Sequence, residues 1–226
     1  MHSLLFWTYF TKLADTNVMM PLAFLLAAWL ACLRRWHEAT LWLVLFCAAL
    51  AIVAATKIAY VGWGIGIASL DFTGISGHAM RATAVAPVFA YLALRKRTPV
   101  AVASAVLIGL AFGVLIAISR LVLHQHSLSE VVIGVLLGGA TSLAYLWLSR
   151  TRRIMPWNTA VIALCMVTIG SGLMAKPAPT ERWIEQIALY LSGRETPYHR
   201  GYSPWRIEKK QGSLSVPCCA ATDRAV

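Results

Sequence analysis

Apolar residues dominate the chain in long runs, and polar residues fall in short clusters between them. Six runs approach the length of about 17–25 residues that a helix needs to cross a bilayer. They cover residues 17–33, 40–56, 79–94, 100–118, 130–148 and 158–175. Of the 226 residues, 59% are hydrophobic, which is too many for an ordinary soluble domain. The pattern predicts an all-α integral membrane protein, built as a bundle of six transmembrane helices.

The two ends of the chain differ from this membrane domain at residues 17–175. Residues 1–16 combine closely spaced aromatic residues with Lys12 and Asp15, which favours a helix lying in the membrane interface over a flexible lead-in. Prolines and charges return in residues 176–226, which we interpret as an extramembrane tail. Within this tail, apolar residues at helical spacing from Glu181 to Leu191 predict an amphipathic helix. Cys218 and Cys219 leave open a strained disulfide or an intermolecular link.

The net charge of +11 is concentrated in three loops between the predicted spans, at residues 34–35, 95–97 and 150–153. Alternate crossings bring these loops to one side of the membrane, and the positive-inside rule makes that side cytoplasmic. Both termini and the loops at 57–78 and 119–129 then face outward. We therefore expect a bacterial-type inner (plasma) membrane protein with an outward-facing site. The topology explains the charge without nucleic acid as a partner.

Polar residues converge on the outward side of the predicted bundle. Lys57 follows the second span, His78 precedes the third, Arg120 follows the fourth, and His126 and Glu130 lie at the start of the fifth. Charged groups at the edge of the apolar region of a membrane are costly and commonly functional. The expected partners in the bilayer are its lipids.

These residue types suit phosphoryl transfer through an enzyme nucleophile. Glu130 lies four residues after His126 on the same helical face, so it can accept a proton from one imidazole nitrogen and leave the other free to attack phosphorus. His126 is the predicted nucleophile. His78 is the predicted acid that protonates the leaving oxygen and then the base that activates water.

The phosphate oxygens need positive or donor groups around them. Arg120 offers a planar set of donors, Lys57 offers a point charge, and Ser76 and Gly77 precede a helix whose first N–H groups favour anions. Arg81 lies one turn after His78 and is a further candidate for the phosphate. This set requires neither a metal ion nor a cofactor.

The motifs resemble those of the type-2 phosphatidate phosphatase superfamily of lipid phosphatases, which also includes vanadium haloperoxidases. The third family motif, Ser-Arg, five residues, His, three residues, Asp, matches Ser119, Arg120 and His126, with Glu130 replacing the aspartate. The second, Pro-Ser-Gly-His, matches residues 76–78 and has Ile75 in place of proline. The resemblance covers roughly residues 50–148 and implies metal-independent hydrolysis through a phosphohistidine.

The first family motif, Lys, six residues, Arg-Pro, is only half present. Lys57 is followed at that spacing by Gly64 and Ile65. The missing arginine removes one phosphate donor, which Arg81 is placed to replace. Loss of such a donor costs about 10²–10³ in rate.

The sequence leaves several functions open. The expected substrate is a membrane lipid phosphomonoester or an isoprenoid or lipid pyrophosphate. The alternatives are a lipid phosphotransferase that uses the same residues, and a lipid-phosphate binding or transport protein without turnover. His124 and His126 are a weak metal pair, because no third ligand lies nearby. The oligomeric state is not determined by the sequence.

Overall fold

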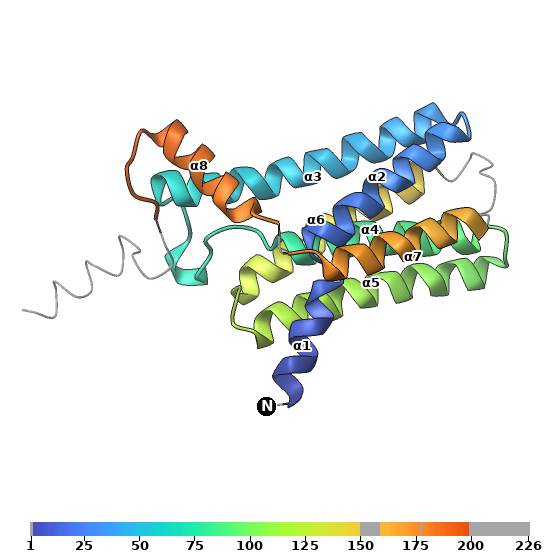
Figure 1. The fold of residues 1–226 in the computed structure, drawn as a ribbon, viewed down its shortest axis with the longest axis horizontal. Coiled ribbons are helices and arrows are strands. Elements are labelled where there is room, and N and C mark those ends of the chain that lie inside the picture. Colours follow the sequence, from blue (N-terminus) through green and yellow to red (C-terminus); the bar gives the residue numbers. More distant parts are fainter. Residues whose placement is uncertain (1, 150–158, 177, 199–226) are drawn as a thin grey trace, which may run out of the picture.

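The computed structural model describes residues 2–149, 159–176 and 178–198, and the regular elements in these ranges are helical (Figure 1). Cys218, Cys219 and the basic residues at 150–153 lie outside them. The helices are α1 His2–Lys12, α2 Thr16–Cys32, α3 Trp36–Trp63, the short 3₁₀ helix η1 Ala68–Leu70, α4 Gly77–Leu94, α5 Pro99–Val122, α6 Leu128–Ser149, α7 Thr159–Met174 and α8 Thr180–Ser192.

Helix α4 occupies the interior of the bundle. It packs mainly against α5 and α6 and also contacts α2 and α3. Most of its residues are buried, among them the fully buried Ala79, Met80, Ala82 and Thr83. The other long helices therefore hold α4 within protein, which positions the residues at its N-terminus.

Glycines spaced four residues apart bring α5 and α6 close to α4. They are Gly109 and Gly113 on α5, and Gly134 and Gly138 on α6. A Cβ on Gly134 would lie 2.7 Å from the carbonyl oxygen of Ser76, and one on Gly113 or Gly138 would overlap α4 itself. Small residues at this spacing let helix backbones approach where lipid provides no hydrophobic drive. The path of α4 therefore depends on these glycines.

An aromatic cluster ties α2, α3 and α6 together. Trp42 stacks on Phe46 with ring centroids 5.2 Å apart, and Tyr145 meets Trp42 edge-on at 5.5 Å. The indole N–H of Trp42 donates to the carbonyl oxygen of Ala23, 2.9 Å away, so this fully buried ring leaves no polar atom unpaired.

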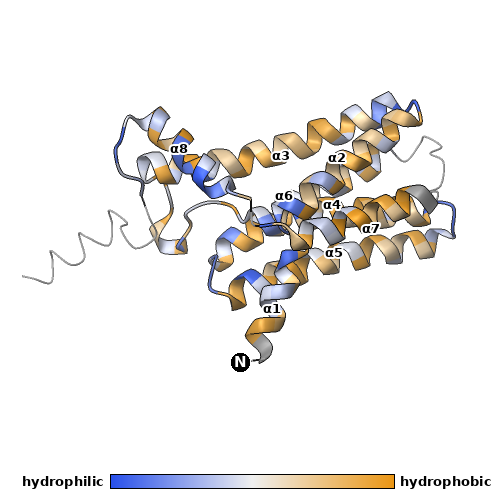
Figure 2. Ribbon diagram, in the orientation of Figure 1, coloured by the Kyte–Doolittle hydropathy of each residue, from blue (hydrophilic) through white to orange (hydrophobic). Residues whose placement is uncertain are grey.

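Four helical stretches among the described residues are long and apolar enough to cross a membrane. They are Leu4–Cys32, Trp36–Trp63, Pro99–Val122 and Leu128–Ser149. Figure 2 shows hydrophobic residues along the helices and hydrophilic ones gathered near their ends. The chain is thus an all-α membrane protein, as predicted. Helix α7 is apolar but shorter, and α4 carries His78 and Arg81, so the count of six spans stays a prediction.

Helix boundaries differ from the sequence pattern around the polar residues. The second predicted span ends at residue 56, but α3 continues to Trp63 and stops where Gly64 adopts a left-handed conformation with φ 69°. Lys57 therefore projects from within a helix. Likewise α5 extends to Val122, so Arg120 belongs to its last turn. The amphipathic helix predicted in the tail is present as α8, which packs against α3.

Candidate active site

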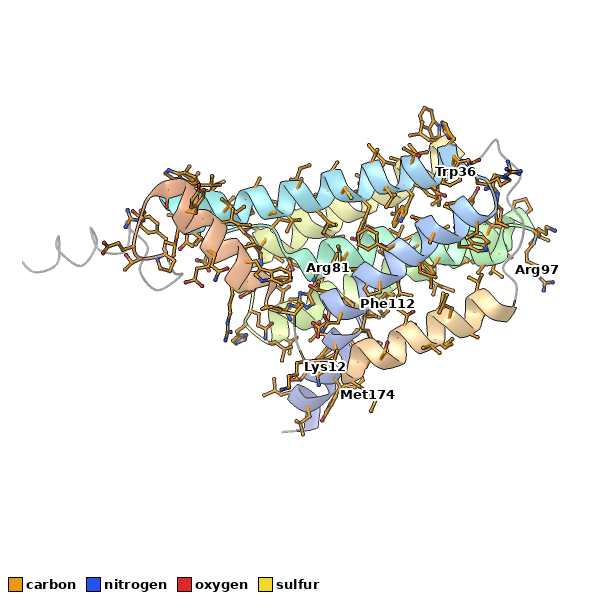
Figure 3. All side chains as sticks on the ribbon, turned by 45° about the horizontal axis from the view of Figure 1, so that its top comes forward. Lys12, Trp36, Arg81, Arg97, Phe112 and Met174 are labelled. Carbon is orange, nitrogen blue, oxygen red and sulfur yellow. The ribbon has the colours of Figure 1, made fainter. Side chains whose placement is uncertain are left out.

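A cavity of about 860 Å³ opens at the end of the bundle where α3, α4 and α5 meet the start of α6. Six of the predicted site residues line it: Lys57, Gly77, His78, Arg81, Arg120 and His126. Residues of α8 and of the α1–α2 junction complete its wall. The structure brings these groups together at one end of the bundle. Figure 3 shows Arg81 inside the bundle, far from Trp36 and Arg97 at its other end.

His126 and Glu130 form a hydrogen-bonded pair at the start of α6. Nδ1 of His126 lies 2.6 Å from Oε2 of Glu130, and the ionised carboxylate can only accept, so Nδ1 carries the proton. The other carboxylate oxygen accepts from the backbone N–H of Thr73 at 2.7 Å and also from the Thr73 hydroxyl. This fixes the imidazole with Nε2 as the nitrogen that bears a lone pair.

Burial lowers the pKa of the His126 imidazole, because a site shielded from water disfavours the charged form. The hydrogen bond to Glu130 acts in the opposite direction. The side chain is only 12% exposed. The net result is a histidine that stays neutral below its ordinary pKa of about 6.5, which is the form that can act as a nucleophile.

His78 also binds a carboxylate, and this partner was not assigned from the sequence. Nε2 of His78 lies 2.7 Å from Oδ1 of Asp15, a residue at the α1–α2 junction. Both side chains are partly exposed to the cavity, at 19% and 28%. The cavity therefore contains two histidines, each bonded to a carboxylate through one ring nitrogen.

Three cationic side chains predicted for the site accompany these histidines, and Lys12 lines the cavity as well. Lys57 reaches Glu181 of α8 at 3.4 Å, and Nη1 of Arg120 donates to the hydroxyl of Thr11 at 3.4 Å. Arg81 is buried and lies close to Gly77, where a Cβ would be 3.1 Å from its Nη1. The Nε atoms of Arg81 and Arg120 have no hydrogen-bond partner among the described residues.

Ser76 and Gly77 differ in how they meet the cavity. Gly77 lines it, whereas the Ser76 side chain is fully buried and its backbone N–H donates to the carbonyl oxygen of Glu130 at 3.1 Å. Ser76 thus connects the start of α4 to the start of α6. Its contribution to an anion site is therefore indirect, since that N–H already has a partner.

No group of three or more His, Cys, Asp or Glu side chains in the described part of the chain is arranged to hold a metal ion. His124 turns away from His126, and its Nδ1 lies 3.1 Å from the carbonyl oxygen of Leu121.

Sequence reasoning missed Asp15, Thr73, Glu181 and Thr11 as neighbours of the site. Thr73 and Asp15 lie 57 and 63 residues from their partners Glu130 and His78. No spacing rule links positions so far apart in the sequence. Among the histidine–carboxylate contacts, only that of His126 with Glu130 had a local signal, because these residues lie one helical turn apart.

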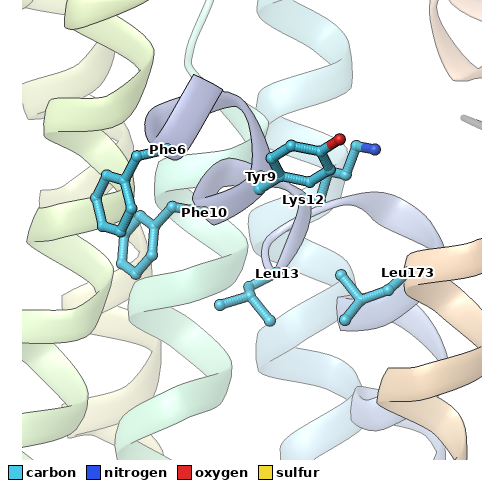
Figure 4. A pocket seen from close by; sticks show the side chains of 6 residues that line it. All are labelled: Phe6, Tyr9, Phe10, Lys12, Leu13 and Leu173. Carbon is cyan, nitrogen blue, oxygen red and sulfur yellow. The ribbon is translucent and has the colours of Figure 1, made fainter. Parts of the chain in front are cut away.

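A second, mostly apolar hollow of about 470 Å³ lies between α1 and α7 (Figure 4). Its lining consists of Phe6, Tyr9, Phe10, Lys12, Leu13 and Leu173. Lys12 lines both this hollow and the larger cavity. The apolar hollow therefore adjoins the polar site.

Comparison with known proteins agrees with the motifs in this cavity. The family model described as the PAP2 superfamily matches residues 62–154, which include His78, Arg120 and His126 but not Asp15 or Lys57. An "uncharacterized 22.5 kDa protein in cps region" of Klebsiella pneumoniae is 34% identical over 201 residues, which cover 86% of this chain and 95% of that protein. No solved structure matches the chain. The chain belongs to the PAP2 superfamily, the type-2 phosphatidate phosphatase superfamily whose motifs it carries.

Proposed function

We propose that the protein is a membrane-embedded phosphatase that hydrolyses a lipid phosphomonoester or a lipid or isoprenoid pyrophosphate through a phosphohistidine. The observation that carries this proposal is the His126–Glu130 pair in a cavity that His78, Lys57, Arg81 and Arg120 also line. Membership of the PAP2 superfamily supports phosphatase chemistry. The lipid substrate and the covalent intermediate are our inference from the geometry.

In the first step, the lone pair of His126 Nε2 attacks phosphorus and forms a P–N bond. The bond from phosphorus to the leaving oxygen breaks, and this oxygen takes a proton from His78. The products are the lipid alcohol, or the lipid monophosphate when the substrate is a pyrophosphate, and phosphorylated His126. Glu130 stabilises the positive charge that develops on the His126 ring.

In the second step, neutral His78 accepts a proton from water while the water oxygen attacks phosphorus. The P–N bond breaks, its electron pair returns to His126, and inorganic phosphate leaves. Both histidines then have their starting protonation states. The same residue acts first as acid and then as base, so no further proton donor is required.

The cations hold the phosphoryl oxygens through both steps. Arg120 and Arg81 present guanidinium groups to the cavity, and Lys57 presents an ammonium. Oriented positive groups of this kind stabilise charge on the transferring group without rearrangement. Arg81 supplies a second guanidinium where the first family motif lacks its arginine.

The apolar hollow beside the site supports a substrate with a hydrocarbon chain. Lys12 marks the point where the polar cavity and the hollow adjoin. A phosphate held by the cations can place an attached chain along the rings of Phe6 and Phe10, which stack with centroids 5.7 Å apart. The bilayer supplies such molecules directly.

The test is phosphate release by the purified full-length protein in detergent. The panel contains phosphatidate, phosphatidylglycerol phosphate, lipid A phosphate and an isoprenoid pyrophosphate, each with and without EDTA, beside His126→Ala. We expect release that persists in EDTA and disappears in the variant. Wild-type protein quenched in alkaline SDS, where the P–N bond of phosphohistidine survives, should carry label from ³²P substrate on His126.

Other outcomes separate the alternatives. Label that passes from the protein to an added lipid alcohol, with little free phosphate, indicates a phosphotransferase. Tight binding of the lipids without label or release indicates a binding or transport protein. Release that EDTA abolishes would overturn the metal-independent mechanism.

A further inference from the structure

We propose that Asp15 is a positioning residue that holds His78 in one tautomer and supports its change from acid to base. The inference rests on the proposed function. Asp15 lies outside the segment that the family model matches, residues 62–154. The structure contributes it to the site from the N-terminal part of the chain.

Asp15 does not make the hydrogen bond that is usual for its position at the start of α2. Asp15 is the N-cap residue of α2, where an aspartate usually accepts a hydrogen bond from a backbone N–H of the first turn. Here its side chain makes no such bond and reaches Nε2 of His78 at 2.7 Å instead. A side-chain cap would stabilise the start of α2, so the contact with His78 has replaced a favourable local one.

Helix α1 holds Asp15 in place through its contacts with α5. The ring of Phe10 meets that of Phe112 edge-on with centroids 5.9 Å apart, and the hydroxyl of Thr11 accepts from Arg120. Ala14 is fully buried. The α1–α2 junction is therefore packed against the bundle, and the carboxylate has a defined position beside His78.

The hydrogen bond determines which ring nitrogen of His78 exchanges protons. Because the carboxylate accepts from Nε2–H in both charge states of the ring, the neutral form has its lone pair on Nδ1. Nδ1 has no hydrogen-bond partner among the described residues, and His78 lines the cavity. Nδ1–H then protonates the leaving oxygen, and the same nitrogen takes the proton from water.

The charges around His78 come from several elements. Burial has the largest effect and lowers the pKa of His78, and the charges of Arg81 on α4 and Arg120 on α5 lower it further. Asp15, its only carboxylate partner within the described residues, acts in the opposite direction. The other titratable groups that line the cavity are Lys12, Lys57, Tyr60, His126, Glu181, Glu185 and Tyr198. The Asp15 carboxylate therefore offsets two guanidinium groups and favours the imidazolium that the acid step needs.

Asp15→Asn tests this proposal because the amide oxygen can still accept from Nε2–H while the charge is lost. With dodecyl phosphate, whose alcohol needs a proton to leave, we expect kcat to fall by about 10²-fold, as for the loss of an acid–base group. With p-nitrophenyl phosphate, which needs little protonation, the first step should persist. The variant should then give a burst of p-nitrophenol, accumulate phosphohistidine, and lose activity on the basic side at lower pH than wild type.

Controls distinguish this role from a structural one. Glu195→Gln removes an exposed carboxylate that does not line the cavity and should behave as wild type. A lower KM in Asp15→Asn with unchanged kcat and pH profile would show that Asp15 only competes with phosphate, and this would overturn the proposal. So would equal losses with both substrates and no burst.

A readout without turnover tests the hydrogen bond itself. ¹⁵N spectra of imidazole-labelled protein should show the Nε2–H tautomer of His78 in wild type and a mixture of tautomers in Asp15→Ala. A single unchanged tautomer in both would overturn the proposal. Wild-type protein that releases no phosphate from any substrate would instead overturn the proposed function, on which the proton-transfer role depends.

Discussion

Glu130 is held from both sides, and this explains how a glutamate can stand where the resembling motif has an aspartate. One carboxylate oxygen binds His126 at 2.6 Å, and the other accepts from the backbone N–H of Thr73 at 2.7 Å. The side chain is almost fully buried. The extra methylene places the carboxylate between α6 and the loop before α4. The hydrogen bond from Thr73 in that loop then fixes the rotamer of the glutamate, which has one more rotatable bond than an aspartate.

The pH dependence of kcat/KM follows from the state of His126. Burial lowers its pKa, so the neutral nucleophile persists on the acid side of its ordinary pKa of about 6.5. We expect the acid limb of the profile to have its midpoint below pH ~6.5. A steady-state profile between pH 4 and 9 measures this. Glu130→Gln should move the limb to still lower pH, because the lost carboxylate favoured the imidazolium, and should lower kcat about 10²–10⁴-fold.

A midpoint above that of free histidine would contradict this expectation. It would mean that the charge of Glu130 outweighs the effect of burial in the working enzyme. Phosphohistidine labelling with p-nitrophenyl phosphate at each pH distinguishes a loss of the nucleophile from a loss of the acid. The leaving group of this substrate needs little protonation, so only loss of the nucleophile abolishes the label.

Residue spacing predicted one of the two histidine–carboxylate pairs and not the other. His126 and Glu130 share a helix face four residues apart, so local geometry alone brings them together. Asp15 and His78 meet because α1 packs on α5, which is a tertiary contact with no local pattern. Aspartate at the start of a helix commonly acts as a cap, so the position of Asp15 in the sequence gave no indication of its contact with His78.

The approach of α6 to α4 controls the position of the His78 turn. We expect Gly134→Ala to destabilise the protein by about 1–3 kcal/mol, as overpacking does, because its Cβ would lie 2.7 Å from the carbonyl oxygen of Ser76. Activity should fall as well, since Ser76 precedes His78 by two residues. Thermal unfolding in detergent and phosphate release measure the two effects.

Gly139→Ala is the matched control, because a Cβ on Gly139 meets nothing within 4 Å. It makes the same substitution on the same helix and should leave both measurements near wild type. Equal effects of the two variants would mean that glycine within α6 matters for the helix backbone and not for its contact with α4.

The apolar runs predicted that the long helices exist, but they did not predict which helix lies inside the bundle. Residues 79–94 looked like any other span, yet α4 lies in the interior and is shielded by protein. Hydropathy measures how apolar a segment is and not whether lipid or protein surrounds it. Helical spacing also predicted the amphipathic helix α8 in the tail. Its position beside the cavity depends on its packing against α3, which the sequence pattern does not show.

The C-terminal helix α8 contributes Glu181 to the cavity, where this carboxylate pairs with Lys57. The charge of Lys57 lowers the pKa of this carboxylate, so it is ionised at neutral pH. In the proposed mechanism it would compete with the substrate phosphate for the lysine. Because Glu181 is 86% exposed, the pair contributes only about 0.2–1 kcal/mol. We expect Glu181→Gln to lower KM by about two- to fivefold with little change in kcat.

Steady-state kinetics with a soluble lipid phosphate check this expectation. Glu185→Gln changes a carboxylate of the same helix that makes no ion pair with a described residue, and its effect on KM should be smaller. A higher KM in Glu181→Gln would instead indicate that Glu181 orients Lys57 toward the phosphate.

Membrane orientation is a property of the whole chain, and it depends on which end of the bundle carries the basic loops. Arg97 lies at the end opposite the cavity (Figure 3), in one of the basic loops that the positive-inside rule places in the cytoplasm. At the cavity end, the amide of Asn17 donates to the carbonyl oxygen of Lys176 at 2.7 Å, which ties the end of α7 to the start of α2. Helix α8 therefore lies on the side of His126.

Reporter fusions test this orientation directly. A reporter that works only outside the cytoplasm should be inactive when fused after Arg97 and active when fused at the C-terminus, and a cytoplasmic reporter should give the reverse. Equal signals at both sites would show that α7 does not cross the membrane. A cytoplasmic C-terminus together with an external Arg97 would turn the cavity inward, and its substrates would then have to come from the inner leaflet.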